Sequence, residues 1–137
     1  MTRAILEMGM GNDLHGEDYT KAAKRAINDA LHHSSLSFIK TLNIDKNELF
    51  VNVTIGVQKP ESVETEQLKK LLPVGVVSIK VVRGGLDVPD HENNDPAVIA
   101  SAAIEVMLDA EKEKIKTTFL KSKSLIQILK SHNILFC

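Results

Sequence analysis

The sequence predicts a small α/β (or α+β) domain in which three main strands alternate with three helices that pack on the sheet. Segments with strand periodicity are separated by segments with helical periodicity, an order typical of parallel strands joined by right-handed crossovers. A chain of 137 residues is long enough to bury one core. We expect residues 1–110 to form this α/β core domain and residues 111–137 to form a basic, helical C-terminal extension.

The first half of the chain is predicted to hold two strands around one long helix. The expected elements are a strand at residues 3–8, a helix at 18–33, a short helical turn at 36–42 and a strand at 48–57. The long helix has alanines, Ile27 and Leu31 along one stripe, which is the spacing of a buried helical face. Asp18 is a suitable N-cap for it.

The second half is predicted to add a short helix, a third strand and a third helix. The expected elements are a helix at residues 63–72 that Pro73 ends, a strand at 74–82, a polar loop at 86–94 and a helix at 97–110. The strand is apolar almost throughout, which favours a central place in the sheet. Asp95 and Pro96 form a favourable helix start, with Asp as N-cap and Pro at the first helical position.

The predicted helix at 97–110 points to a homo-oligomer. Apolar residues surround its axis, and Glu105 is its only charge before Asp109. A helix that is apolar all round is buried on more than one side, and a subunit interface is a natural second partner in so small a domain. The alternative is that the C-terminal segment covers the second side.

Charge and composition exclude several classes of protein. Residues 1–110 hold 11 Lys/Arg against 16 Asp/Glu, so nucleic acid is a disfavoured partner, although the Lys-rich stretch at 111–137 could act as an interaction arm. No apolar run is long enough to cross a membrane, and the N-terminus does not resemble a secretory signal. Cys137 is the single cysteine, which excludes an intrachain disulfide and fits the reducing cytoplasm.

The best candidate for a functional site is the loop Gly9-Met10-Gly11-Asn12-Asp13-Leu14-His15-Gly16. His15 could act as an acid, a base or a ligand, with Asp13 as its partner. The backbone of Gly9, Gly11 and Gly16 could cradle an anion. These residues are the predicted centre of an enzyme or binding protein for a small anionic metabolite.

Three loops should meet at this site. In a parallel sheet the segments 9–17, 58–62 and 83–94 would all leave the carboxyl ends of strands at one edge, where open α/β sheets bind ligands. Lys59 and Arg83 would then add ligand-binding cations from the second and third loops.

Other interpretations of the loop remain open. Asp13 and His15, with Glu7 or His91, could hold a divalent metal, although no cofactor is specified by the sequence. Alternatively, the loop is a structural turn in which Asp13 caps backbone groups, and the protein is a non-catalytic oligomeric module. The glycine spacing does not match a dinucleotide fingerprint, because the third glycine falls at 16 instead of 14.

The stretch from Glu7 to Gly16, followed by Thr20-Lys21-Ala22-Ala23, resembles a family of conserved hypothetical proteins that was first defined from a Listeria genome. The family motif G-x-G-x-D-x-H-G is matched here by Gly9, Gly11, Asp13, His15 and Gly16. The resemblance covers about residues 3–110 and implies no activity, because the family has none established. Residues from Glu111 onward depart from the family pattern.

Overall fold

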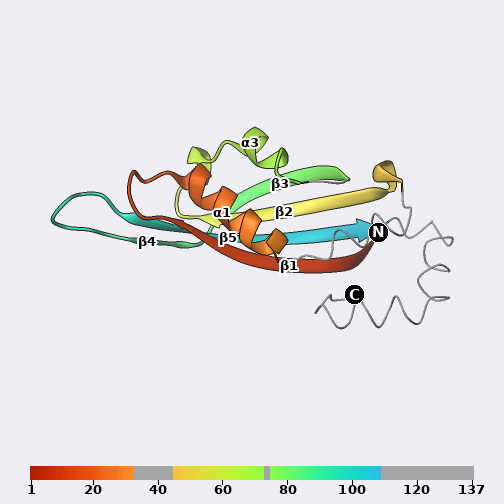
Figure 1. Cartoon of the computed structure of the whole chain (residues 1–137), viewed down its shortest axis with the longest axis horizontal. Helices are drawn as coiled ribbons and strands as arrows, with labels where there is room; N and C mark the ends of the chain where they lie inside the picture. Colours follow the sequence, from red (N-terminus) through yellow and green to blue (C-terminus); the bar gives the residue numbers. More distant parts are fainter. Residues whose placement is uncertain (33–44, 73–74, 109–137) are drawn as a thin grey trace.

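The computed structural model describes residues 1–32, 45–72 and 75–108, which form one five-stranded sheet with helices on one face (Figure 1). The elements are, in order, β1 (Thr2–Asp13), α1 (Tyr19–His32), the 3₁₀ turn η1 (Lys46–Glu48), β2 (Leu49–Val57), the 3₁₀ turn η2 (Pro60–Ser62), α3 (Thr65–Lys69), β3 (Val76–Arg83), β4 (Leu86–Val88) and β5 (Ala97–Leu108). The predicted turn at 36–42 and the predicted extension at 111–137 lie outside the described residues.

The sheet is mixed, with strand order β1-β5-β2-β3. β2 and β3 run parallel, as the crossover through α3 requires, whereas β1, β2 and β4 are all antiparallel to β5. The predicted α/β or α+β class is confirmed. The count of three strands and three helices is wrong, because the described residues form five strands and two α-helices.

The largest error concerns residues 97–110, which were expected to form a helix. Ala97–Leu108 is strand β5 at the centre of the sheet, and its residues are alternately buried and less buried. Every residue of this segment is apolar apart from Ser101 and Glu105. Neither the helical period of 3.6 residues nor the strand period of two therefore stands out in the sequence. The expected oligomer contact through a helix at 97–110 is therefore wrong.

Two further expectations about strands need correction. β3 is an edge strand and not a central one, so its apolar residues are only partly buried. β1 extends to Asp13, so the first half of the expected Gly9–Gly16 loop is strand. The strand at 48–57 and the helix at 18–33 are confirmed to within two residues, and the Asp18 side chain caps α1 by accepting the Lys21 N–H at 3.0 Å.

The core lies between α1 and the sheet, where α1 packs closely on β1 and β5. Small residues make this approach possible: Ala22, Ala26 and Ala30 of α1 are fully buried. A Cβ added at Gly11 would lie 2.2 Å from the Ala26 backbone nitrogen, and one at Gly9 would lie 2.4 Å from that of Ala30. Glycine at both positions is therefore required by backbone-to-backbone contact.

Candidate functional site

The loops that follow β1, β2 and β3 meet at one end of the sheet. β1 and β2 are both antiparallel to β5, and β3 is parallel to β2, so these three strands point the same way. Lys59 Nζ of the second loop contacts Glu17 Oε1 of the first at 2.7 Å. Gln58 Nε2 of the second loop donates to the Gly84 carbonyl of the third at 3.0 Å. The predicted gathering of loops is therefore present.

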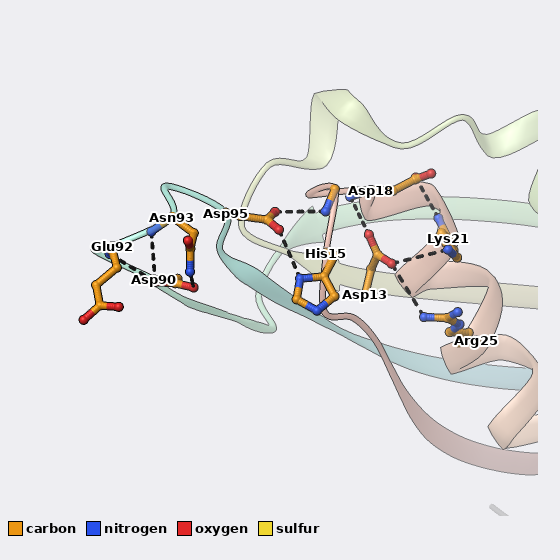
Figure 2. Close-up of polar contacts among 10 residues, drawn as sticks. Asp13, His15, Asp18, Lys21, Arg25, Asp90, Glu92, Asn93 and Asp95 are labelled. Carbon is orange, nitrogen blue, oxygen red and sulfur yellow. Dashed lines mark hydrogen bonds and ion pairs between the residues drawn. The ribbon is translucent and has the colours of Figure 1, made fainter.

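Asp13 anchors the N-terminus of α1 (Figure 2). It is 2 % exposed, and its Oδ2 accepts the backbone N–H of Asp18 at 3.0 Å. Its Oδ1 lies 3.6 Å from both Lys21 Nζ and Arg25 Nη1. A carboxylate before a helix satisfies a free N–H and complements the positive end of the helix dipole. Asp13 is thus held by α1 and is not the hydrogen-bond partner of His15.

His15 pairs instead with Asp95, just before β5 (Figure 2). Its side chain is 87 % exposed, and its Nδ1 lies 3.1 Å from Asp95 Oδ2. The Gly16 N–H donates to Asp95 Oδ1 at 2.9 Å. This N–H, and then His15, hold the pKa of the Asp95 carboxyl below its usual range. The turn that was expected to bind an external anion therefore binds a carboxylate of its own chain.

The tip of the β4–β5 connection beside this pair is built on Asp90 (Figure 2). Its Oδ1 accepts the backbone N–H groups of Glu92 and Asn93 at 3.1 and 3.2 Å, and its Oδ2 accepts from the Asn93 side chain at 2.9 Å. The Asn93 side chain is the main cause of the lowered pKa of the Asp90 carboxyl. This carboxylate is committed to its own turn.

The remaining predicted site residues are not gathered around His15. Lys59 is paired with Glu17, whose carboxylate is the main cause of the raised pKa of the lysine. Arg83 is exposed at the end of β3. Glu7 lies in β1 and His91 in the β4–β5 connection, and within the described residues no group of three or more His, Cys, Asp or Glu side chains could hold a metal.

A buried contact between Tyr19 and Asp87 was missed at the sequence level. Tyr19 is 3 % exposed, and its hydroxyl donates to Asp87 Oδ2 of β4. The other oxygen, Asp87 Oδ1, is buried without a hydrogen-bond partner among the described residues. Burial, and then the Asp87 carboxylate, raise the pKa of Tyr19 far above its usual value. The available signal was that Tyr19 is the only tyrosine and opens the first turn of a helix.

Glu17 lies beside this contact in a left-handed backbone conformation, with φ of 51°. Such a conformation is uncommon for a residue with a side chain. The Lys59 ion pair holds it, and Lys59 Nζ also lies 6.0 Å from the centre of the Tyr19 ring. The charged groups Lys59 and Glu17 therefore join the second loop to the first, and the lysine is committed within the fold.

The architecture is that of a mixed-sheet domain with a single helical layer and a polar junction of loops at one end. Residues 3–106 match the model of the family described as "Conserved hypothetical protein (Lin0512_fam)". The chain therefore belongs to this family, as its N-terminal motif suggested.

A solved structure is similar to this chain over most of its length. The chain is similar to an FtsZ-like protein of unknown function from Nostoc punctiforme, with 36 % identity and a TM-score of 0.69. The match covers 78 % of this chain and 95 % of that one. None of the curated proteins matches the chain. No helix in the described part of the chain is long and apolar enough to span a membrane.

Proposed function

We propose that this protein is a non-catalytic, self-associating module whose copies assemble through the sheet face opposite α1 and α3, here called the open face. The observation that carries this proposal is a set of large apolar side chains that remain exposed on that face. They are Met8 at 68 %, Met10 at 62 %, Leu86 at 56 %, Val76 at 47 % and Val88 at 46 %.

The strand registers place these residues on one surface. Met8 is opposite Ala103 and Met10 is opposite Ser101, whereas the intervening Gly9 is opposite the buried Ala102. Successive residues of a strand point to opposite faces, so the methionines lie on the side away from α1. By the same alternation, Leu86 and Val88 extend this surface along β4, and Val76 lies at its far end on β3.

The open face is large enough for an interface. Four strands about 4.8 Å apart, each contributing about eight residues at roughly 3.3 Å, give about 500 Å² per copy. Two copies would bury on the order of 1,000 Å², near the lower bound for a specific interface. The apolar part of this face is smaller than the whole, and the largest apolar patch on a soluble domain is often a functional contact site. The Arg3–Glu105 ion pair, at 3.5 Å, supplies a polar element within it.

The motif residues support a structural function over chemistry. Gly9 and Gly11 allow α1 to approach β1, and Asp13 fixes the start of α1. Lys59 is occupied by Glu17, so it offers little attraction to a small anion. These assignments favour the module over the metabolite-binding interpretation.

The test is the mass in solution of the parent and of the double variant Met8→Asp/Met10→Asp. Light scattering across a concentration series should give an oligomer for the parent and a clearly smaller mass for the variant at the same concentrations. Leu14→Asp is the matched control, since Leu14 is 58 % exposed but follows the end of β1, and it should keep the parent mass. A monomeric parent, or an unchanged mass of the double variant, would refute the proposal.

One observation favours a second candidate, a small-molecule site at His15. Asp95 orients Nδ1 while most of the ring is exposed, the arrangement of an imidazole that can exchange protons with a solute. Phosphate, carboxylates and divalent cations would be screened by thermal shift on the parent and on His15→Ala. This function predicts a rise in melting temperature in the parent alone. Equal responses of the two proteins would exclude His15 as the ligand group.

A further inference from the structure

The two edge strands of the sheet, β1 and β3, differ in whether side chains occupy their outward backbone groups. At the β1 edge, the backbone N–H of Met10 donates to Asp29 Oδ2 of α1 at 2.9 Å. Two residues further on, the carbonyl of Asn12 accepts from Arg25 Nη1 of α1 at 2.6 Å. Side chains that occupy the outward backbone groups of an edge strand prevent another strand from pairing there. α1 therefore closes this edge.

The β3 edge lacks such a closure. β3 pairs with β2 over eight residues, from Phe50 opposite Val76 to Val57 opposite Arg83, and with no other strand in the part of the chain that the structure describes. In residues 1–32, 45–72 and 75–108, no side chain is hydrogen-bonded to the outer backbone of β3. Its sequence, Val-Val-Ser-Ile-Lys-Val-Val-Arg, is rich in β-branched residues. An open edge of this composition readily accepts another strand.

The helix-facing residues of β3 support the same conclusion. Val77, Ile79 and Val81 pack against the core but stay only partly buried, because none of the described strands lies beyond them. A strand added at this edge would bury them further and continue the core sideways. The occupant must therefore offer apolar residues at alternate positions.

We propose that β3 pairs with β3 of a second copy, antiparallel and centred on Ile79, so that two sheets join into one. This inference takes from the proposed function only that the partner is a second copy; its contact is separate from the open face. Pairing about Ile79 places Ile79 opposite Ile79 and Val77 opposite Val81. Directly opposite residues point to the same face, so the helices of both copies stay on one side.

The charges of β3 are compatible with this register, which also pairs nearly the whole strand. Lys80 falls opposite Ser78 and Arg83 falls opposite Gly75, so no like charges are directly opposite, and the two Lys80 side chains are diagonal neighbours. Centring on Lys80 would place two lysines directly opposite each other, which is destabilising.

Strands of eight residues, about 26 Å long, bury well under 1,200 Å² in total, which is typical of weak interfaces. We therefore expect a concentration-dependent pair, which would also double the width of the open face.

The test is disulfide trapping in the full chain with Cys137→Ser, so that each variant has one cysteine. Ile79→Cys should give a covalent dimer on mild oxidation, because opposite Cα atoms in antiparallel strands are about 4.5–5.5 Å apart. Val77→Cys alone should not, since its own copy would lie about four residues away along the strand. A mixture of Val77→Cys and Val81→Cys chains should again cross-link.

A second pair of cysteine variants, at exposed positions, keeps the test valid if Ile79→Cys misfolds because Ile79 is half-buried. Ser78 and Lys80 are exposed, and Ser78→Cys mixed with Lys80→Cys should cross-link far better than Lys80→Cys alone. Repeating the trapping with Met8→Asp/Met10→Asp separates the two interfaces. Cross-links that persist there support the β3 contact even if the open face fails. The β3 contact would be overturned by two results together. Ile79→Cys would give no more cross-linked dimer than Val77→Cys, and the Ser78→Cys/Lys80→Cys mixture would give no more than Lys80→Cys alone.

Discussion

At the residue scale, Gly11 and Asp13 of the N-terminal motif both act on α1: one allows its close packing on β1 and the other fixes its start. Gly11 is needed because a Cβ would meet the backbone of α1. Asp13 is needed because it accepts the Asp18 N–H just before α1 and lies near two cations of that helix. The sequence predicted that these residues matter, and it predicted Asp13 as a capping group among its alternatives. It could not predict Asp95 as the partner of His15, because that contact spans eighty residues.

Gly11→Ala should be severely destabilising. The added Cβ would lie 2.2 Å from the Ala26 nitrogen, and backbone cannot move aside as a flexible side chain can. We expect a loss of about 3 kcal/mol or more in the free energy of unfolding by urea. Gly56→Ala is the control, since its Cβ would meet nothing nearer than 3.4 Å and should cost about 1 kcal/mol or less. Similar losses in both variants would contradict the close α1–β1 approach.

Tyr19 should resist ionisation in the folded protein. It is the only tyrosine and there is no tryptophan, so near-ultraviolet tyrosinate absorbance reports this residue alone. Because its pKa is raised on folding, its contribution to stability is complete below the ordinary pKa of 10.0 and is lost as the pH rises towards the folded value.

The native protein should therefore show little tyrosinate at about pH 11, where a urea-unfolded sample is largely ionised. Tyr19→Phe should lack the corresponding loss of stability above pH 10. A native titration midpoint near 10 would mean that the Tyr19–Asp87 contact is absent in solution.

At the scale of elements, the sequence predicted α1 and β2 because each has one clear periodicity, and it predicted the strand of β3 from a nearly continuous apolar run. It failed at β5, where alanine favours helix and the Asp95-Pro96 pair imitates a helix start. The structure uses those alanines as small residues below α1, and it uses the Asp95 carboxylate to hold the His15 turn. Both outcomes depend on tertiary contacts that no local pattern contains. The edge position of β3 was likewise unpredictable, since it follows from where β5 inserts.

Valine substitutions distinguish the two faces of β5. Ala100 is fully buried below α1, so Ala100→Val should overpack the core and cost about 1–3 kcal/mol in urea unfolding. Ala103 lies on the open face, where Val should be neutral or stabilising by up to about 0.5 kcal/mol. A helix at these residues would instead be weakened by both substitutions. Equal destabilisation would therefore contradict the alternation.

At the scale of the whole molecule, the helices cover one face of the sheet and α1 closes one edge (Figure 1). The open face and the β3 edge are left for other contacts. An oligomer was first expected from a helix at 97–110. Its physical basis is now the open face of the sheet. Association through the open face would remove its exposed apolar side chains from water.

Oxidation of individual methionines by peroxide, followed by mass spectrometry, tests the open-face interface most directly. Met8, Met10 and Met1 are similarly exposed in a single copy, at 68 %, 62 % and 65 %. If copies assemble through the open face, Met8 and Met10 should become protected as protein concentration rises, while Met1, which precedes β1 at the border of this face, should be protected less. Equal oxidation of all three at every concentration would contradict the proposed self-association.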